Sequence, residues 1–323
     1  NRRNGSKPLH YVFQKRRTCR VATKKMKRLD LERKTIDVND FKKRTALRSD
    51  VSKLIKEDVI IYCNGQPVIL YKKIEDETSH LRWAVKNIKY GTGKRTRGLI
   101  STSSIFGYRP RLEMRQDYCS STAMARTYPK QHHVITDYAK KIVQFYEEYF
   151  PDKFAMHKQM VEDKVMDDWT IGGTPFTSGI VNKNNQLKYH FDSGNFSGVL
   201  SNMIVFKRDT KGGYLVIPEF DIALEVADKT LTIFNGQDIL HGVSPIENQN
   251  EHAYRYSIVY YSLKRMWQCE PINEEIARIR KRKTEREKNR IDPEHIKKLQ
   301  KRKEEFAKEN ETDKQRARKN DKN

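Results

Sequence analysis

Long hydrophobic runs and paired cysteines are both missing from this chain of 323 residues. No apolar run reaches about 18 residues, so we expect no transmembrane span, and no signal-peptide pattern opens the chain. The cysteines are scattered without a CxxC pair, which argues against a zinc site and against a disulfide framework. They are Cys19, Cys63, Cys119 and Cys269. We therefore expect small buried thiols in an intracellular protein, either cytoplasmic or nuclear.

Acidic residues are too few to balance the basic ones, 42 against 65, which leaves a formal charge of +23. The excess lies at the ends of the chain. Residues 1–50 hold 17 basic and 5 acidic residues, and residues 270–323 hold 19 and 13, whereas residues 51–269 hold 29 and 24. Basic ends favour a polyanionic partner, most simply nucleic acid, although lysine-rich termini can also serve solubility alone.

The sequence divides into a basic arm (1–50), a central domain (51–269) and a charged helical tail (270–323). In the central domain, Asn64-Gly65 between two β-rich runs predicts a hairpin over residues 58–71. The glycines of residues 91–104 match no phosphate-binding loop, and the segment is interpreted as flexible. Residues 134–150 have the apolar spacing of one amphipathic helix. In the tail, helices are predicted over about 274–290 and 294–309.

Short strands and turns dominate residues 169–263, which favours a sandwich or jelly roll, with no internal repeat. The predicted strands are residues 199–206, 213–217, 222–226, 231–234 and 254–263. With the helices around them, they indicate an α+β fold.

His190 and Asp192 are two positions apart on a predicted strand, so their side chains point to the same face. His241, which follows a later strand and turn, is the candidate third ligand. Two histidines and a carboxylate occupy one face of an octahedral Fe(II) and leave three positions open. A 2-oxoacid and O2 can fill those positions.

Arg255 and Ser257 lie two apart on the last predicted strand, among Tyr, Ile and Val. An unpaired arginine is costly in such surroundings, whereas its planar fork suits the distal carboxylate of 2-oxoglutarate. Ser257 can add a hydroxyl donor. The spacing therefore predicts a 2-oxoglutarate site beside the metal.

Taken together, these motifs resemble the TET/JBP family of nucleic-acid-base dioxygenases over about residues 100–263. The segments that carry the resemblance are Val181-Asn-Lys-Asn, His190-Phe-Asp-Ser-Gly-Asn195, Ser201-Asn-Met-Ile-Val, Gly212-Gly-Tyr-Leu-Val-Ile-Pro-Glu219, His241-Gly-Val-Ser-Pro245 and Arg255-Tyr-Ser-Ile-Val-Tyr-Tyr261. The compact form, without large insertions, is similar to phage, microbial and protist members.

The resemblance implies a double-stranded β-helix (jelly roll) core, Fe(II) and 2-oxoglutarate as cofactors, and O2 as co-substrate. It also implies double-stranded DNA as partner, with the target base flipped out, because a methyl group in the stacked duplex cannot reach a buried iron. The implied reaction converts 5-methylcytosine to 5-hydroxymethylcytosine, with thymine to 5-hydroxymethyluracil as the alternative. We expect a monomer that does not use a membrane.

The resemblance also assigns a base site. Asn195 would hydrogen-bond the base, Tyr261 would stack on it, and Val259 would form an apolar wall between them. Leu263 departs from the animal members, which place a base-contacting histidine there, so the choice of base stays open. One arginine of the similar segment 106–115 is expected to reach 2-oxoglutarate or a phosphate, and the candidates are Arg109, Arg111 and Arg115.

Three other functions share parts of this pattern. A protein side-chain hydroxylase shares the metal and arginine motifs but leaves the basic ends unexplained. An RNA-base oxidase differs only in its polymer, and a DNA-binding module with a degenerate oxygenase fold would not need the complete ligand set. Four other histidines lack the strand context of the metal-ligand candidates, so we interpret them as ordinary polar residues. They are His132, His133, His157 and His252.

Overall fold

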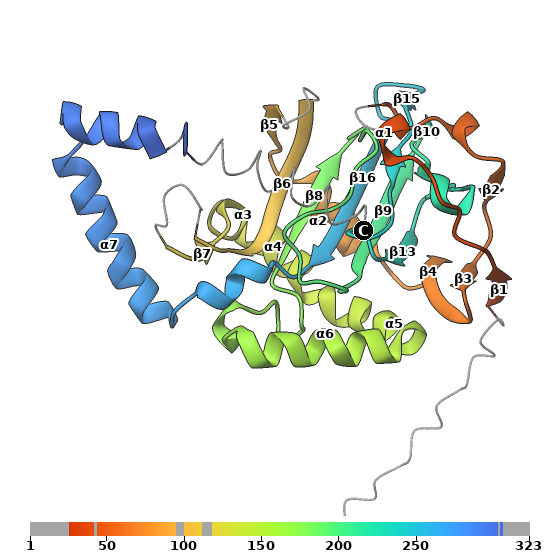
Figure 1. The fold of residues 1–323 in the computed structure, drawn as a ribbon, viewed down its shortest axis with the longest axis horizontal. Coiled ribbons are helices and arrows are strands. Elements are labelled where there is room, and N and C mark those ends of the chain that lie inside the picture. Colours follow the sequence, from red (N-terminus) through yellow and green to blue (C-terminus); the bar gives the residue numbers. More distant parts are fainter. Residues whose placement is uncertain (1–25, 42–43, 95–99, 112–117, 303, 306–323) are drawn as a thin grey trace, which may run out of the picture.

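The computed structural model describes residues 26–41, 44–94, 100–111, 118–302 and 304–305 (Figure 1). Its strands are β1 (Lys27–Asp30), β2 (Lys53–Ile55), β3 (Val59–Cys63), β4 (Gln66–Lys73), β5 (Gly91–Lys94), β6 (Ile100–Arg109), β7 (Ser120–Ser121), β8 (Ser178–Lys183), β9 (Ser201–Arg208), β10 (Thr210–Gly212), β11 (Leu215–Ile217), β12 (Ile222–Leu224), β13 (Thr230–Phe234), β14 (Gly242–Val243), β15 (Ile246–Asn248) and β16 (Tyr254–Tyr261). Its helices are α1 (Val38–Phe41), α2 (Ser79–Lys86), α3 (Ala123–Thr127), α4 (Pro129–Asp137), α5 (Ala139–Tyr149), α6 (Pro151–Lys164) and α7 (Ile272–Lys288), and residues 293–302 are also helical. Short 3-10 turns are η1 (Arg48–Asp50), η2 (Asp167–Trp169), η3 (Pro218–Phe220) and η4 (Lys264–Gln268).

The core is a double-stranded β-helix made of two facing sheets. The larger sheet runs in the order β1-β3-β4-β13-β9-β16-β8-β6-β5, with β7 on β6, and the smaller in the order β14-β11-β12-β2. From β8 onward the chain alternates between the two sheets. After β8, the segment at His190 pairs with His241, which adjoins β14 of the smaller sheet. The chain then returns to the larger sheet in β9. The strands β11, β12 and β14 then belong to the smaller sheet, and β13 and β16 to the larger. This winding confirms the expected α+β fold with a jelly-roll core.

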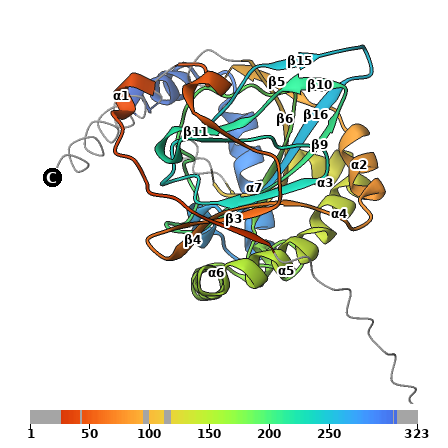
Figure 2. The ribbon, with the colours of Figure 1, turned by 90° about the vertical axis from the view of Figure 1, so that its right-hand side faces the viewer.

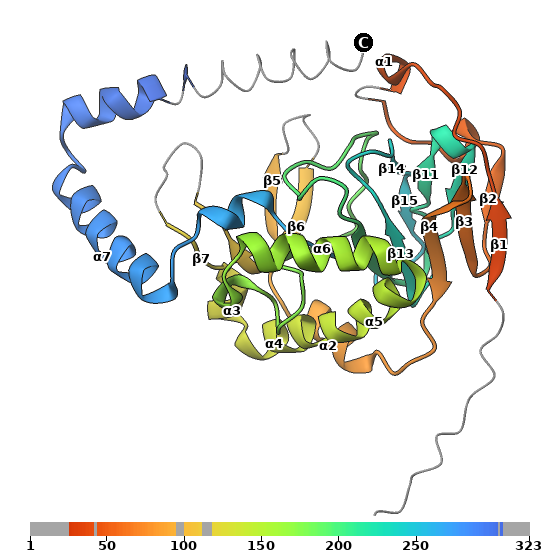
Figure 3. The same cartoon turned by 60° about the horizontal axis from the view of Figure 1, so that its bottom comes forward.

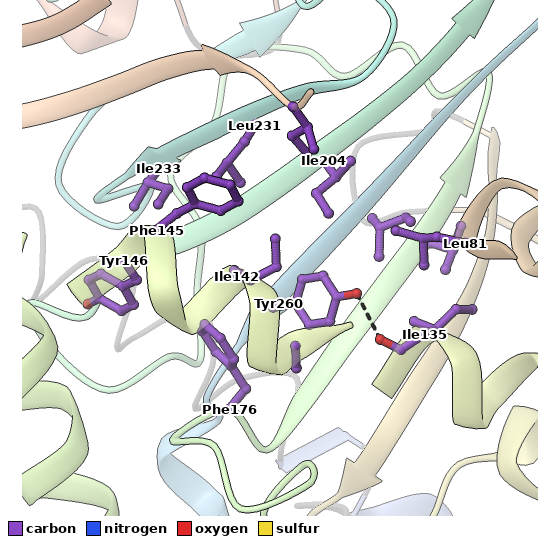
Figure 4. Close-up of a cluster of buried hydrophobic side chains, with 14 of the residues drawn as sticks. Leu81, Ile135, Ile142, Phe145, Tyr146, Phe176, Ile204, Leu231, Ile233 and Tyr260 are labelled. Atoms are coloured by element: carbon purple, nitrogen blue, oxygen red, sulfur yellow. Dashed lines mark hydrogen bonds between the residues drawn. The ribbon is translucent and has the colours of Figure 1, made fainter. Parts of the chain in front are cut away.

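The alternation of side chains along the central strands explains the layers. In β9, Ile204 faces the cluster that contains the helices, whereas Val205 faces the smaller sheet. Helices α5 and α6 lie along the outer side of the larger sheet (Figures 1 and 3). Figure 4 shows Ile142 and Phe145 of α5 packed against β9 and β13, and Tyr260 donating a hydrogen bond to the carbonyl of Ile135 at 2.8 Å.

The predicted hairpin is confirmed as β3 and β4. Asn64 and Gly65 take φ angles of 50° and 76°, a left-handed pair that a two-residue turn requires. Two other expectations were wrong. Residues 91–104 are not a loop, because β5 and β6 pair there, with 95–99 outside the described residues. Residues 134–150 form the end of α4 and all of α5, which divide at Tyr138.

Both basic ends contact the core where they are described. Strand β1 pairs in parallel with β3 and so joins the edge of the larger sheet. At the other end, α7 extends away from the body of the molecule, on the side opposite β1 (Figures 1 and 3). Viewed from the side of β3 and β4, α7 lies behind the sheets (Figure 2). Residues 1–25 and most of 303–323 lie outside the described residues. No helix in the described part of the chain is long and apolar enough to cross a membrane.

The expectation about the cysteines was wrong for one pair. Cys119 and Cys269 form a disulfide across a sequence separation of 150 residues, whereas Cys63 is free and Cys19 lies outside the described residues. Such a bond links the chain beside β7 to the start of the tail. Local spacing could not reveal it, since only the folded chain brings these positions together.

Candidate active site

A cavity of about 280 Å³ opens between the two sheets of the β-helix. The residues proposed from the sequence as metal ligands, as 2-oxoglutarate contacts and as base contacts on the catalytic strands all line it. The lining includes His190, Asp192, Asn195, His241, Arg255, Ser257, Val259 and Tyr261, together with Asn182, Asn185, Ser201 and Leu263. The structure thus brings residues from several strands and their connecting segments to one chamber.

The ligand atoms of His190, Asp192 and His241 lie within 4.8 Å of one another. Asp192 Oδ1 is 3.8 Å from Nε2 of His190 and 3.9 Å from Nε2 of His241. The two imidazole rings are 4.3 Å apart between centroids, tilted by 50°. Such spacing is what three donors need to converge on one ion, and two imidazoles with one carboxylate fit Fe(II).

Backbone pairing sets the direction of both imidazoles. His190 and His241 bond each other through their main chains, N to O at 2.9 and 3.2 Å. Their Nδ1 atoms face the carbonyls of Lys188 and Ile239, at 2.8 and 2.9 Å. A carbonyl only accepts, so each Nδ1 carries the proton, and each Nε2 faces the other ligands with its lone pair.

Two hydrogen bonds hold Asp192, one to Gly236 after β13 and one from Ser201 in β9. Its amide donates to the carbonyl of Gly236 at 2.8 Å, and Ser201 Oγ donates to its Oδ2 at 3.3 Å. A Cβ at position 236 would lie 2.2 Å from Asp192 Oδ2, so only glycine leaves room for the carboxylate. Neither Gly236 nor Ser201 was singled out as a site residue from the sequence. The Asn-Gly turn after a strand signals Gly236 only weakly.

Arg255 is a buried cation, 1% exposed. Among the described residues, its Nε and Nη2 have no hydrogen-bond partner. Burial lowers the pKa of its guanidinium to about 10. A buried, unpaired guanidinium is strongly unfavourable, so this arrangement calls for an anion in the cavity. A carboxylate of 2-oxoglutarate has the right charge and shape.

Beside Arg255, a chain of amides and hydroxyls continues the polar wall. Asn182 Nδ2 donates to Ser257 Oγ at 3.3 Å, and Asn185 Nδ2 donates to Asn182 Oδ1 at 2.9 Å. Asn185 also donates to Ser101 Oγ at 2.9 Å. The two asparagines were not named as site residues from the sequence, although Asn182 lies in a motif that carries the family resemblance.

The residues proposed for the base line the same cavity. Asn195 is 5% exposed, and its main chain bridges to Leu263. Its Nδ2 donates to Ser201 Oγ at 3.4 Å. Tyr261 and Val259 are half-buried on β16. The cavity therefore combines the metal-ligand candidates with apolar and aromatic side chains.

The arginines of segment 106–115 do not line the cavity where they are described. Arg111 forms an ion pair with Glu275, and Arg109 Nε donates to Ser120 Oγ at 2.9 Å. Their expected role toward 2-oxoglutarate is therefore not supported for these two residues. Arg115 lies outside the described residues.

His157 corrects another expectation, because it is fully buried rather than an ordinary polar residue. Its Nε2 lies 2.7 Å from Ser262 Oγ, which itself donates to the carbonyl of Pro175 at 2.6 Å. Ser262 therefore accepts from Nε2–H. Burial lowers the pKa of His157 to about 3, so the ring is neutral and supports the end of β16.

Part of the chain is similar in sequence to known oxygenase domains. Residues 108–264 match the Tet_JBP family model, described as the oxygenase domain of the 2OGFeDO superfamily. A stretch of 120 residues is 29% identical to the bifunctional helicase and thymine dioxygenase JBP2 of Trypanosoma brucei brucei, covering 36% of this chain. That stretch spans only 10% of the length of the relative.

NgTET1 in complex with 5mC DNA matches with a TM-score of 0.49 and 13% identity, covering 78% of this chain and 90% of that one. A 2OG-Fe(II) family oxidoreductase from Burkholderia pseudomallei matches with a TM-score of 0.39 and 11% identity, covering 60% and 84%. Residues 108–264 therefore carry an oxygenase domain of the TET/JBP type, from the Fe(II)- and 2-oxoglutarate-dependent superfamily, and the three metal-ligand candidates lie within it.

Proposed function

We propose that this protein hydroxylates the 5-methyl group of a pyrimidine flipped out of double-stranded DNA. The observation that carries the proposal is the coexistence, in one cavity, of a complete ligand set for Fe(II) and a buried guanidinium that calls for an anion. A binding-only module with a degenerate oxygenase fold would need neither feature.

In this proposal His190, Asp192 and His241 hold the iron, and Arg255 and Ser257 hold the distal carboxylate of 2-oxoglutarate. Bound Fe(II) with 2-oxoglutarate supplies the activation of O2 that a methyl C–H bond requires. The burial of Arg255 keeps water from competing for the carboxylate, which strengthens the pairing and fixes the cosubstrate beside the ligands.

The base is oriented by a hydrogen-bond chain that starts at the metal ligand. Ser201 gives its proton to Asp192, so it can only accept from Asn195 Nδ2. The amide of Asn195 is thereby fixed, with Oδ1 as the acceptor available to a base N–H. Tyr261 and Val259 supply the ring stacking and the apolar wall.

Two bases carry the methyl group. 5-Methylcytosine is the candidate favoured by the sequence, and thymine is supported by the thymine dioxygenase relative from Trypanosoma. Both offer an N–H group to the Asn195 acceptor on the Watson–Crick edge. Leu263 adds only an apolar contact at the cavity.

DNA as the polymer is supported by the distribution of cations. The exposed residues of α7 include Arg280, Lys281, Lys283, Arg286 and Lys288. Each phosphate that such a cation neutralises releases counterions and adds affinity at low salt.

The decisive experiment supplies Fe(II) and 2-oxoglutarate with duplex DNA that contains either 5-methylcytosine or only thymine, and identifies the nucleosides by mass. We expect a hydroxymethylated pyrimidine from one of the two substrates. Turnover of 2-oxoglutarate without an oxidised base in either DNA would contradict the proposal and favour an RNA or protein substrate.

The same assay tests the ligand assignment. We expect His190→Ala and Asp192→Ala to lose succinate formation and Fe(II) binding. His252→Ala serves as the matched control, since His252 is an exposed histidine outside the cavity. Full activity in either ligand variant would refute the metal site.

A further inference from the structure

A second hollow, of about 580 Å³, lies on the surface beside the candidate active site. We name it the tryptophan groove. It is lined by Met160, Asp163 and Lys164 from the last turns of α6, by Phe196 and Ser197 after the metal motif, and by Lys264 and Trp267 of η4. Nothing in the proposed reaction uses these side chains.

The exposed indole of Trp267 is the most unusual feature of the groove. Its exposed fraction is 58%, whereas Trp169 is buried at 3%. An exposed indole offers a flat surface on which another planar ring can stack. Because the neighbouring core cluster of described residues does not include Trp267, folding alone does not explain its position.

The charges around Trp267 favour an anionic partner. Lys164 and Lys264 are both exposed and line the groove, against the single carboxylate of Asp163. Lys164 Nζ lies 6.0 Å from the ring centroid of Phe196, another lining residue. An exposed aromatic ring together with lysines is the combination that single nucleic-acid strands require: stacking for a base and cations for phosphates.

The groove and the candidate active site share one wall. The main chains of Asn195 and Leu263 bridge each other, and Lys264 N donates to Gly194 O at 2.9 Å. Asn195 and Leu263 line the cavity, whereas the adjoining Phe196 and Lys264 line the groove. The groove is therefore adjacent to the cavity that would receive the nucleotide.

We propose that the tryptophan groove binds the DNA strand that flanks the flipped nucleotide. Trp267 stacks on a neighbouring base that has lost its stacking partner, and Lys164 and Lys264 neutralise the phosphates on either side. The inference rests on the proposed function, since it takes a flipped nucleotide in the cavity as its starting point. Flipping costs stacking free energy, which an aromatic surface at this position replaces.

The first test measures affinity for a short duplex by fluorescence anisotropy, without iron, so that catalysis plays no part. We expect Trp267→Ala to weaken binding about tenfold and Trp267→Phe to keep most of it, because phenylalanine still offers a ring. Trp83→Ala is the matched control, since Trp83 is a 44% exposed tryptophan on α2, outside the groove. Equal affinities of the Trp267→Ala and Trp83→Ala proteins would overturn the proposal.

The second test uses salt. The double variant Lys164→Ala/Lys264→Ala should reduce the slope of log affinity against log salt by up to about 2, because each phosphate that is no longer neutralised accounts for roughly 0.9 of the slope. The control Lys130→Ala/Lys153→Ala removes two exposed lysines from α4 and α6 and should leave the slope close to that of the native protein. An equal slope change in both double variants would show that the effect comes from the net charge of the protein. That result would overturn the groove proposal.

The base-oxidation assay separates this inference from the proposed function. If the native protein oxidises a DNA base but Trp267→Ala does so with unchanged kcat/KM, the groove proposal fails and the function stands. If the native protein neither binds nor oxidises DNA, both fail. Loss of binding by Trp267→Ala with normal 2-oxoglutarate and Fe(II) affinity supports the groove, because the cavity is then intact.

Discussion

At the scale of single residues, the candidate metal centre depends as much on what surrounds the ligands as on the ligands themselves. Two carbonyls set the imidazoles of His190 and His241, and the absence of a side chain at Gly236 makes room for Asp192. Supporting groups of this kind commonly change metal affinity by about 10- to 100-fold. Two single substitutions therefore test the centre without touching a ligand.

Gly236→Ala should weaken Fe(II) binding by about tenfold or more while the protein stays folded, because the new Cβ would displace the Asp192 carboxylate. Gly236 does not have a positive φ, so alanine strains no backbone angle there. Iron titration measures the effect. Gly93→Ala is the control, since a Cβ there meets nothing within 4 Å. Equal iron affinities would contradict the positioning role of Gly236.

Ser201→Ala should lower the yield of oxidised base per 2-oxoglutarate consumed. Without the hydroxyl, the amide of Asn195 loses the acceptor that fixes its orientation, while Arg255 still holds the cosubstrate. Measuring oxidised nucleoside and succinate in the same reaction gives the ratio. An unchanged ratio would show that Ser201 does not orient the base site.

At the scale of elements, the smaller sheet is completed by a strand from the N-terminal region. Strand β2 pairs in parallel with β12. Asp221, immediately before β12, stabilises this pairing through hydrogen bonds to the segment that precedes β2. Its carboxylate accepts from the amide of Ser52 at 2.7 Å, from the Ser52 hydroxyl and from Lys34 Nζ at 3.1 Å. These bonds lower the pKa of Asp221 to about 2.

Because the pKa of Asp221 is lowered on folding, its contribution to stability is present above its ordinary pKa of 3.8 and is lost as the pH falls toward 2. We therefore expect Asp221→Asn to be less stable than the native protein at pH 5, with the difference shrinking between pH 4 and pH 2. Urea unfolding at a series of pH values measures this. A difference that is constant with pH would exclude the ionised carboxylate as the cause.

Some strands follow from the local sequence, whereas others form only through pairing with a distant strand. The hairpin β3–β4 was predicted because Asn64-Gly65 favours the left-handed turn that it needs. Strand β6 was missed because its glycine, serine and threonine residues have no strong apolar alternation. It forms because β8 offers a paired edge from Ser103 to Gly107.

At the scale of the whole molecule, the domain is joined to the tail by covalent and ionic links. The disulfide between Cys119 and Cys269 is accompanied by Glu275 at the start of α7, 1% exposed, which accepts from Arg111 and from the amide of Cys119. These contacts orient α7, whose cations are the ones proposed to meet DNA. The orientation of the tail is therefore tied to the core.

Reduction of the disulfide should lower the melting temperature, since a native disulfide typically contributes about 2–4 kcal/mol. Calorimetry with and without reductant measures the change, and we expect Cys119→Ser/Cys269→Ser to be insensitive to reductant. Cys63→Ser, which removes a free thiol, should respond like the native protein. If the native protein melted at the same temperature with and without reductant, a stabilising disulfide between Cys119 and Cys269 would be contradicted.

What the sequence determined by itself is the chemistry of the candidate site and the type of core. Residue identity and short spacing suffice there: His190 and Asp192 share a strand face, and Arg255 among apolar neighbours requires an anion. The tertiary structure alone decided which distant segments meet. It paired Cys119 with Cys269, placed Gly236 against Asp192, assigned Arg111 to Glu275, and set Trp267 beside the cavity. Such contacts join positions far apart in the chain, where no local period or motif records the partner.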